Sequence, residues 1–327
     1  MKKTRKIILS ALIVLTFVLS GVCVGFATAG PTTVQASTTA PAATTTAAPT
    51  GYVPLRPTLE GMGCTVEWYK DLPDQIFVRI GDQLQVFKNH STTIVTDEGE
   101  FHASKETYIE AGTTYIAQDA AQLVKNLNLY HISIKDAEIA DTSELLPLYA
   151  LDASDDKILL CTWHKYPSSY PDGEEVTLKY GDVWTTAAGE IVNLDSRENL
   201  GTGDAFVLRM EQIMGVPPQN GKTHFTLMWA KPEDVYRPAY DTRIDTKSAV
   251  LTFPAGTDDT YKQWFADQQE YSYSPHRYPW TGLGYTFDWA DNGTDYGLSE
   301  YIIKGGATVK VEKTFTNEEF LDYICGH

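Results

Sequence analysis

The first hydrophobic pattern after residue 50 is that of a short helix. Leu55, Leu59 and Met62 recur at intervals of four and three, so their side chains would share one face of a helix. Pro57 suits the first turn of such a helix, and Gly63 suits the position just after its last residue. The pattern therefore predicts a short amphipathic helix that ends at Gly63.

The residues that follow predict hairpins and a second helix. Apolar and polar positions alternate on either side of Gly81-Asp82 and of 97–99, which is typical of strands joined by tight turns. The expected strands are 66–68, 76–80, 84–87, 92–96, 100–103 and 114–117. Helical spacing then continues over 118–128. The strand-then-helix segments that begin near Tyr52 and Tyr115 predict a weak internal repeat.

The pattern between residues 145 and 327 mixes strands and helices without a regular alternation. It predicts strands at 157–164, 225–229, 301–303 and 308–311, helices at 206–214 and 258–269, and a hairpin of 176–180 with 183–185. An acidic stretch at 135–144 reads as a linker between this part and the preceding one. The chain is therefore predicted to be α+β, with a small antiparallel sheet wrapped on a helix followed by a mixed α+β domain.

The N-terminus predicts export. Basic residues at 2–6 precede an uncharged apolar run from Ile7 to about Ala29, with small-residue cleavage patterns after it. The run is also long enough to span a bilayer, so residues 1–29 are interpreted as a signal peptide or an uncleaved N-terminal anchor. Residues 30–51 are mainly Thr, Ala and Pro without charge, which predicts a flexible linker.

The charge of the chain narrows the possible partners. With 43 Asp and Glu against 26 Lys and Arg, the net charge is −17. Nucleic-acid binding is disfavoured because affinity for phosphates comes from clustered Lys and Arg. Contact with a membrane is expected only through an uncleaved N-terminus, and an extracellular or cell-envelope-associated location follows.

Residues 52–132 resemble a known family. The sequence YVPLRPTLEGMGCTVEW at 52–68, the short hairpins after it and the degenerate second copy TYIAQDAAQLVKNL at 114–127 resemble the copper amine oxidase N-terminal-like domain. The resemblance implies a small antiparallel sheet wrapped on a helix, in a module that serves exported bacterial proteins as a stalk.

The chemistry named in that family is not expected here. A copper amine oxidase catalytic domain needs a His-x-His pair and an Asn-Tyr-Asp/Glu tyrosine, whereas this chain has no His-x-His and its nearest tyrosine motif is Ala239-Tyr240-Asp241. His164 and His224 have no second ligand at metal-binding spacing. Cys64, Cys161 and Cys325 form no CxxC pair. We expect neither a metal nor a cofactor.

An aromatic-rich segment provides the main functional hypothesis. Residues 261–301 contain twelve aromatic residues in 41 positions, against 12% aromatics in the whole chain. The candidate ligand-binding residues within it are Tyr278, Trp280, Tyr285 and Trp289. Aromatic rings suit the faces of sugars, so a cell-wall glycan, or a protein at the cell surface, is the expected partner. The alternative is that the alternating rings at 285, 287 and 289 form one buried face of a strand.

A catalytic alternative rests on two strands. His164 ends one apolar strand, and Glu300 precedes YIIKGGATVKV in another, an arrangement that resembles the His–Tyr–Glu pattern of ADP-ribosyltransferases. The resemblance implies that His164 and Glu300 would be catalytic residues that act on NAD. No residue of this chain is assigned to the tyrosine position of the pattern. The C-terminal part also resembles uncharacterised secreted bacterial proteins with sequences similar to PWTGLGYTFDW, at 279–289 here. Binding rather than catalysis is the favoured interpretation.

Overall fold

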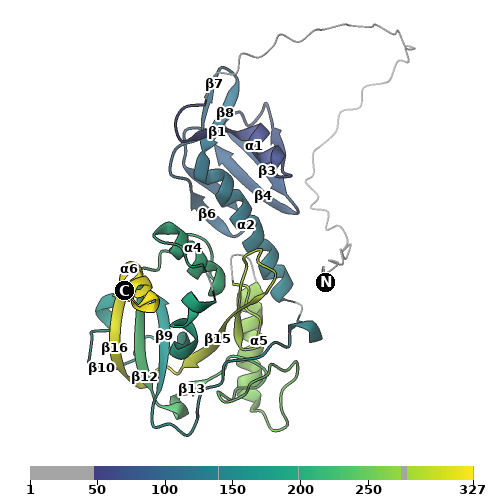
Figure 1. The fold of residues 1–327 in the computed structure, drawn as a ribbon. Coiled ribbons are helices and arrows are strands. Elements are labelled where there is room, and N and C mark those ends of the chain that lie inside the picture. Colours follow the sequence, from purple (N-terminus) through teal and green to yellow (C-terminus); the bar gives the residue numbers. More distant parts are fainter. Residues whose placement is uncertain (1–47, 139, 198, 274–277, 327) are drawn as a thin grey trace, which may run out of the picture. The chain divides into compact units, whose positions relative to one another are not determined.

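The computed structural model describes residues 48–138, 140–197, 199–273 and 278–326, and these fall within one compact unit, 47–327. The predicted signal peptide or anchor at 1–29, and the linker as far as residue 47, lie outside the described residues. The described chain combines helices with antiparallel sheets, which confirms the predicted α+β class (Figure 1).

The first part of the fold contains two small antiparallel sheets. Five strands form a meander in chain order: β2 (Thr65–Trp68), β3 (Gln75–Ile80), β4 (Gln83–Lys88), β5 (Thr93–Thr96) and β6 (Gly99–His102). Three strands form the other sheet in the order β1 (Tyr52–Pro54), β8 (Thr113–Ala117) and β7 (Tyr108–Glu110). The helices are α1 (Leu55–Gly61) and α2 (Gln118–Ala137). The predicted short helix and both predicted hairpins are confirmed.

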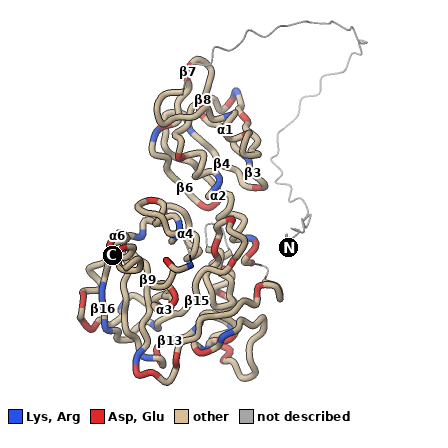
Figure 2. The backbone as a smooth tube through the Cα atoms, viewed as in Figure 1, with Lys and Arg blue, Asp and Glu red and all other residues tan. Residues whose placement is uncertain are grey.

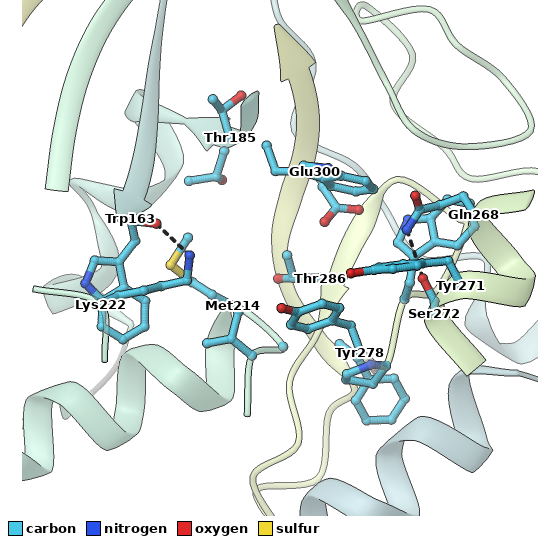
Figure 3. A pocket seen from close by; sticks show the side chains of 17 residues that line it. Trp163, Thr185, Met214, Lys222, Gln268, Tyr271, Ser272, Tyr278, Thr286 and Glu300 are labelled. Atoms are coloured by element: carbon cyan, nitrogen blue, oxygen red, sulfur yellow. Dashed lines mark hydrogen bonds between the residues drawn. The ribbon is translucent and has the colours of Figure 1, made fainter. Parts of the chain in front are cut away.

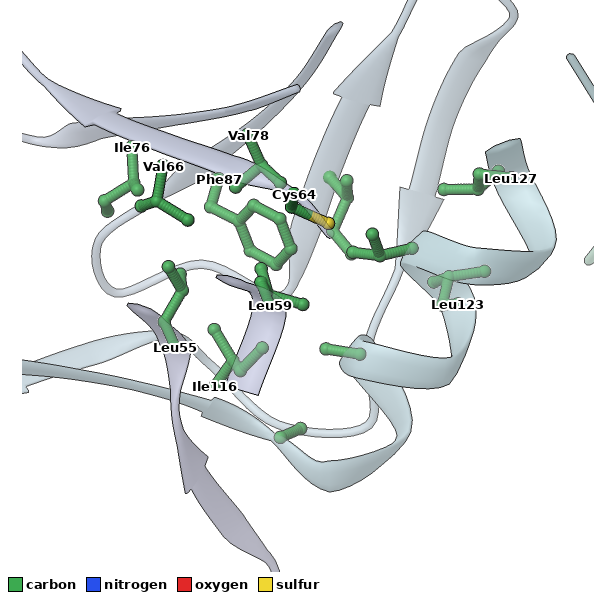
Figure 4. Packing of buried hydrophobic residues seen from close by; sticks show 14 of the residues in the cluster. Leu55, Leu59, Cys64, Val66, Ile76, Val78, Phe87, Ile116, Leu123 and Leu127 are labelled. Atoms are coloured by element: carbon green, nitrogen blue, oxygen red, sulfur yellow. The ribbon is translucent and has the colours of Figure 1, made fainter. Parts of the chain in front are cut away.

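The two copies of the internal repeat lie side by side. Strand β1 pairs antiparallel with β8, so that Tyr52 lies opposite Ala117 and Pro54 opposite Tyr115. Helix α1 follows one strand and α2 follows the other. Leu55 and Leu59 of α1 pack with Phe87 and with Leu123 and Leu127 of α2 in one hydrophobic core (Figure 4). The predicted strand-then-helix repeat is confirmed.

Helix α2 is nine residues longer than its predicted end at residue 128. The extension is held by both polar and apolar contacts. The ring nitrogens of His131 bond with Glu98 and Asp82, the Asp82 contact being 3.0 Å. Tyr130 packs edge-on against Trp289 at a ring separation of 5.9 Å. These partners are distant in sequence, so helical spacing alone did not predict the extension.

The second part of the fold is built on an eight-stranded antiparallel sheet. The strand order is β10-β16-β12-β9-β11-β15-β13, with β14 paired to β15. The strands are β9 (Ile158–His164), β10 (Glu175–Thr177), β11 (Val183–Ala187), β12 (His224–Ala230), β13 (Val235–Tyr236), β14 (Tyr285–Phe287), β15 (Tyr296–Ile303) and β16 (Thr308–Thr316).

Helices cover one face of this sheet. They are α3 (Ala188–Ile191), α4 (Asp204–Ile213) and α6 (Asn317–Cys325), and their apolar side chains pack with those of β9, β12 and β15. Helix α5 (Asp259–Tyr273) carries the first rings of the aromatic-rich segment. Short 3₁₀ turns at Thr142–Glu144, Pro167–Ser169, Leu194–Ser196 and Pro232–Asp234 complete the described elements.

The predicted hairpin of 176–180 with 183–185 is wrong. Strand β10 pairs with β16 at one edge of the sheet, whereas β11 lies between β9 and β15. The hydroxyls of Thr185 and Thr186 donate to the backbone oxygens of Tyr301 and Ser299, which fixes β11 against β15. The chain does turn near Gly181, but the strands on either side of the turn pair with distant strands and not with each other.

Charged residues are distributed along the whole described chain. Figure 2 shows Lys and Arg interspersed with Asp and Glu along the described chain, and the sequence holds 43 acidic residues against 26 Lys and Arg.

Candidate functional site

The residues of the candidate site share one face of the large sheet. Thr186 of β11 lies opposite Cys161 of β9 on one side and opposite Glu300 of β15 on the other. Residues directly opposite in antiparallel strands point to the same face, and so do residues two apart in one strand. Trp163 and Trp184 therefore project from this face together with Glu300.

A cavity of about 350 Å³ lies over this face. Its remaining walls come from the chain just after α4, from the C-terminal end of α5, from the 278–280 segment and from β14 (Figure 3). Cavities of 300–1,000 Å³ with apolar walls and a few polar groups are the usual form of small-ligand sites. The volume is sufficient for a monosaccharide or a similar ring.

Glu300 is the acidic residue of the cavity. Its Oε2 atom is buried without a hydrogen-bond partner, and so is the indole Nε1 of Trp280. Burial raises the pKa of Glu300 to about 8, and the Trp280 indole and the Arg237 guanidinium act in the opposite direction. At pH 7 the carboxyl is therefore mainly protonated, and a carboxylic acid can both donate and accept a hydrogen bond.

Lys222 is the basic residue of the cavity. Its Nζ donates to the backbone oxygen of Trp163 at 2.9 Å. Burial lowers the pKa of Lys222, with a further contribution from Lys165. The backbone N–H of Lys222 donates to Asn220 and its carbonyl accepts from Asn317, so both peptide groups of this residue are anchored.

Aromatic rings form most of the apolar wall. The ring centroid of Trp184 lies 6.3 Å from that of Trp280, in a T-shaped arrangement. It lies 6.5 Å from the ring centroid of Trp264 of α5, in a stacked arrangement. Tyr271 and Tyr278 stand at the rim, 54% and 41% exposed. Such rings can pack against the C–H faces of a sugar without needing to be charged.

The structure separates the four predicted ligand-binding residues into two pairs. Tyr278 and Trp280 line the cavity. Tyr285 and Trp289 are packed in the core, 1% and 2% exposed, so these two rings are buried as the alternative expects. They do not form one strand face, because Trp289 lies beyond the end of β14 and packs in a different cluster from Tyr285. Their polar atoms are bonded as well, because the Tyr285 hydroxyl donates to Glu144 and the Trp289 indole donates to the backbone of α4 and the turn after it.

The structure does not bring His164 together with Glu300. His164 is an odd number of residues from Cys161 along β9, so its side chain points to the opposite face of the sheet from Glu300. There it contacts Thr226, with 2.7 Å from Nε2 to the hydroxyl oxygen. Burial lowers the pKa of His164 to about 4, with smaller effects from His224 and Lys222. The pairing on which the transferase resemblance depends is absent from this cavity.

Sequence reasoning missed Lys222 and Trp184. Lys222 precedes an apolar strand, and only the fold reveals that its side chain reaches the cavity. Trp184 was assigned to a hairpin, which hid its proximity to β15. The available signal was the run Val183-Trp184-Thr185-Thr186, since β-branched and aromatic residues in succession favour a strand.

No group of three or more His, Cys, Asp and Glu side chains among the described residues could hold a metal ion. In the same part of the chain, no helix has the length and apolar character needed to cross a membrane.

Comparisons with known proteins give no family for this chain. No protein-family model matches it, and no curated protein matches it either. The resemblance of residues 52–132 to the copper amine oxidase N-terminal-like domain stays a prediction from the sequence.

Proposed function

We propose that this protein is exported, remains outside the cell or in the cell envelope, and binds a sugar of a wall glycan in the cavity of its C-terminal part. Residues 52–132 serve as a non-oxidase, stalk-like module that presents this part. The N-terminal pattern of basic, apolar and Thr/Ala/Pro-rich segments supports export.

One observation carries the binding proposal: the cavity combines aromatic walls with a few polar groups. Trp184, Trp280 and Tyr278 supply apolar ring surface, and Glu300 and Lys222 supply hydrogen-bonding groups. Sugars present the same combination, with C–H faces between hydroxyl groups. Burial of an unpaired carboxyl destabilises a fold, and a ligand that bonds to it gives a reason for its presence.

Tyr278→Ala is expected to weaken sugar binding about tenfold, because an aromatic contact contributes on the order of 1 kcal/mol beyond its buried area. The ring is 41% exposed, so the melting temperature should change little. Binding of the purified protein to isolated cell wall and to soluble wall oligosaccharides is the measurement.

Tyr180→Ala is the matched control, since Tyr180 is 96% exposed and does not line the cavity. Equal binding by wild type, Tyr278→Ala and Tyr180→Ala proteins would contradict the proposal. Trp280→Ala is a poor first test, because Trp280 is 5% exposed and its loss would also remove core packing.

Location is tested separately. Fractionation of the native host should recover the protein outside the cytoplasm, and mass spectrometry of its N-terminus decides between cleavage and retention of residues 1–29. A full-length cytoplasmic product would refute export without bearing on the cavity.

A further inference from the structure

The cavity does not share the acidic balance of the chain as a whole. The net charge is −17. Among the described residues that line the cavity, Lys222 is the one Lys or Arg and Glu300 the one Asp or Glu. Burial raises the pKa of Glu300 to about 8, so this carboxyl is mainly protonated at pH 7 and Lys222 is the lining residue that can carry a charge. Burial also lowers the pKa of Lys222, and a carboxylate bound beside the ammonium would act in the opposite direction. A cavity of positive potential in an acidic protein favours an anionic ligand.

Lys222 has hydrogen-bonding capacity left for such a ligand. An ammonium group carries three N–H donors. The side-chain bond found for Lys222 in the described structure uses one of them, to the backbone oxygen of Trp163, and no described salt bridge includes this residue. The ammonium is therefore partly buried without a carboxylate beside it, an arrangement that a bound anion would stabilise.

Glu300 lies on the other side of the cavity from Lys222 (Figure 3). The Oε2 atom of Glu300 is buried without a hydrogen-bond partner, so this carboxyl has bonding capacity left for a ligand. The charged side chain that acts on the pKa of Glu300 is Arg237, which lowers it against the larger effect of burial. The acid can thus bond to a hydroxyl of the ligand while Lys222 meets the charged end.

We propose that the cavity selects sugars that carry a carboxylate, which pairs with the Lys222 ammonium while Glu300 bonds to a ring hydroxyl and the rings of Trp184, Trp280 and Tyr278 enclose the sugar. This inference rests on the proposed function and names the ligand class of the same site. It assigns Lys222 as the residue that distinguishes acidic from neutral sugars.

Two matched pairs of probes test the selectivity by calorimetry at pH 7. N-acetylmuramic acid differs from N-acetylglucosamine by a carboxylate-bearing ether, and glucuronic acid differs from glucose by a carboxylate in place of a hydroxymethyl group. The acidic member should bind at least about tenfold more tightly, as expected for a charge-assisted hydrogen bond. The pair with the larger ratio shows which carboxylate position the cavity accepts.

Lys222→Met tests the assigned residue. The variant should lose at least about tenfold in affinity for the acidic sugar and keep its affinity for the neutral one. Lys222→Arg keeps the charge and should retain the preference in part. Lys165→Met is the matched control, since Lys165 is an exposed lysine nearby that does not line the cavity.

The outcomes separate the two proposals. Neutral sugars that bind as tightly as acidic ones overturn the inference and leave sugar binding intact. A preference for acidic sugars that survives in Lys222→Met also overturns the inference. If no sugar or wall fragment binds, the proposed function fails and the inference fails with it. Should Lys222→Met not fold, the matched pairs on the wild-type protein decide alone.

Discussion

Glu300→Gln is expected to raise the free energy of unfolding at pH 7 by about 3 kcal/mol. In the unfolded chain this carboxyl has its ordinary pKa of 4.5, whereas burial raises its pKa in the folded protein to about 8. Each pKa unit corresponds to about 1.4 kcal/mol of differential stability. A glutamine has nearly the same shape as the protonated acid and does not ionise, so it avoids this penalty.

The sign of the pH dependence follows from proton binding. Below pH 4.5 both states hold the proton and Glu300 has no effect on the pH slope. Between pH 4.5 and 8 the folded state holds the proton and the unfolded state does not, so stability falls as pH rises. Above pH 8 both states have lost the proton, and the loss of folding stability caused by Glu300 no longer changes with pH. The difference in stability between Glu300→Gln and wild type should therefore grow from pH 4.5 to pH 8 and then level off.

Urea unfolding of both proteins across this range is the measurement. The pKa values of Glu144 and Glu211 are also raised, each to about 7, so the wild-type slope contains their contributions too. These contributions cancel in the difference between the two proteins. Glu270→Gln, an exposed change on α5, is the control, and its free energy of unfolding should be nearly the same as that of wild type at every pH. A Glu300→Gln protein that is less stable than wild type at pH 8 would show that the carboxylate is stabilised in the folded state.

Arg237→Met is expected to lower the free energy of unfolding by about 3–5 kcal/mol, because it removes several buried, charge-assisted hydrogen bonds at once. Arg237 is 0% exposed. Its guanidinium donates to the backbone oxygens of Gly284 at 3.0 Å and Tyr149 at 2.9 Å, and to the Tyr301 hydroxyl at 3.0 Å. It thereby joins the segments of Tyr149 and Gly284 to β15, on the face of the sheet opposite to Glu300.

Arg243→Met is the matched control. The Arg243 side chain is 68% exposed and pairs with Asp241 at 2.7 Å. Exposed ion pairs contribute about 0–1 kcal/mol, so this change should be small. Chemical unfolding of both variants is the measurement, and similar losses in the two would contradict the structural role of Arg237.

Local patterns in the sequence predicted local structure well. The spacing of Leu55, Leu59 and Met62 predicted α1, and Gly63 has the positive φ, 85°, that a residue after a helix end often needs. Helix α6 was missed although its signal was present, since Thr316 and Glu319 form a capping box. In these segments neighbours along the chain determine the conformation.

The site could be predicted only in part, because it depends on pairing between distant strands. Aromatic enrichment indicated all four rings as ligand-binding residues. Tyr278 and Trp280 line the cavity, whereas Tyr285 and Trp289 lie in the core. The presence of an aromatic residue in a predicted strand does not reveal whether its side chain faces the core or a cavity. Lys222 enters the site through the registry of β12 with β9, which the sequence of either strand does not specify.

The antiparallel pairing of β1 with β8 has a mechanical consequence. Tyr52 is the residue at which the chain enters the three-stranded sheet. It lies opposite Ala117, the last residue of that sheet before α2. A tension pulling Gly51 away from α2 therefore acts at one end of the strand pair and across its hydrogen bonds, which lie perpendicular to the strands. The bonds would then break one after another, beginning with the one from Gln118 N–H to the Gly51 oxygen. Under such a load the pair of β1 and β8 would separate at low force, one hydrogen bond at a time. The chain released in this way would lengthen the first part of the fold, and the C-terminal cavity would carry no tension until that length was extended.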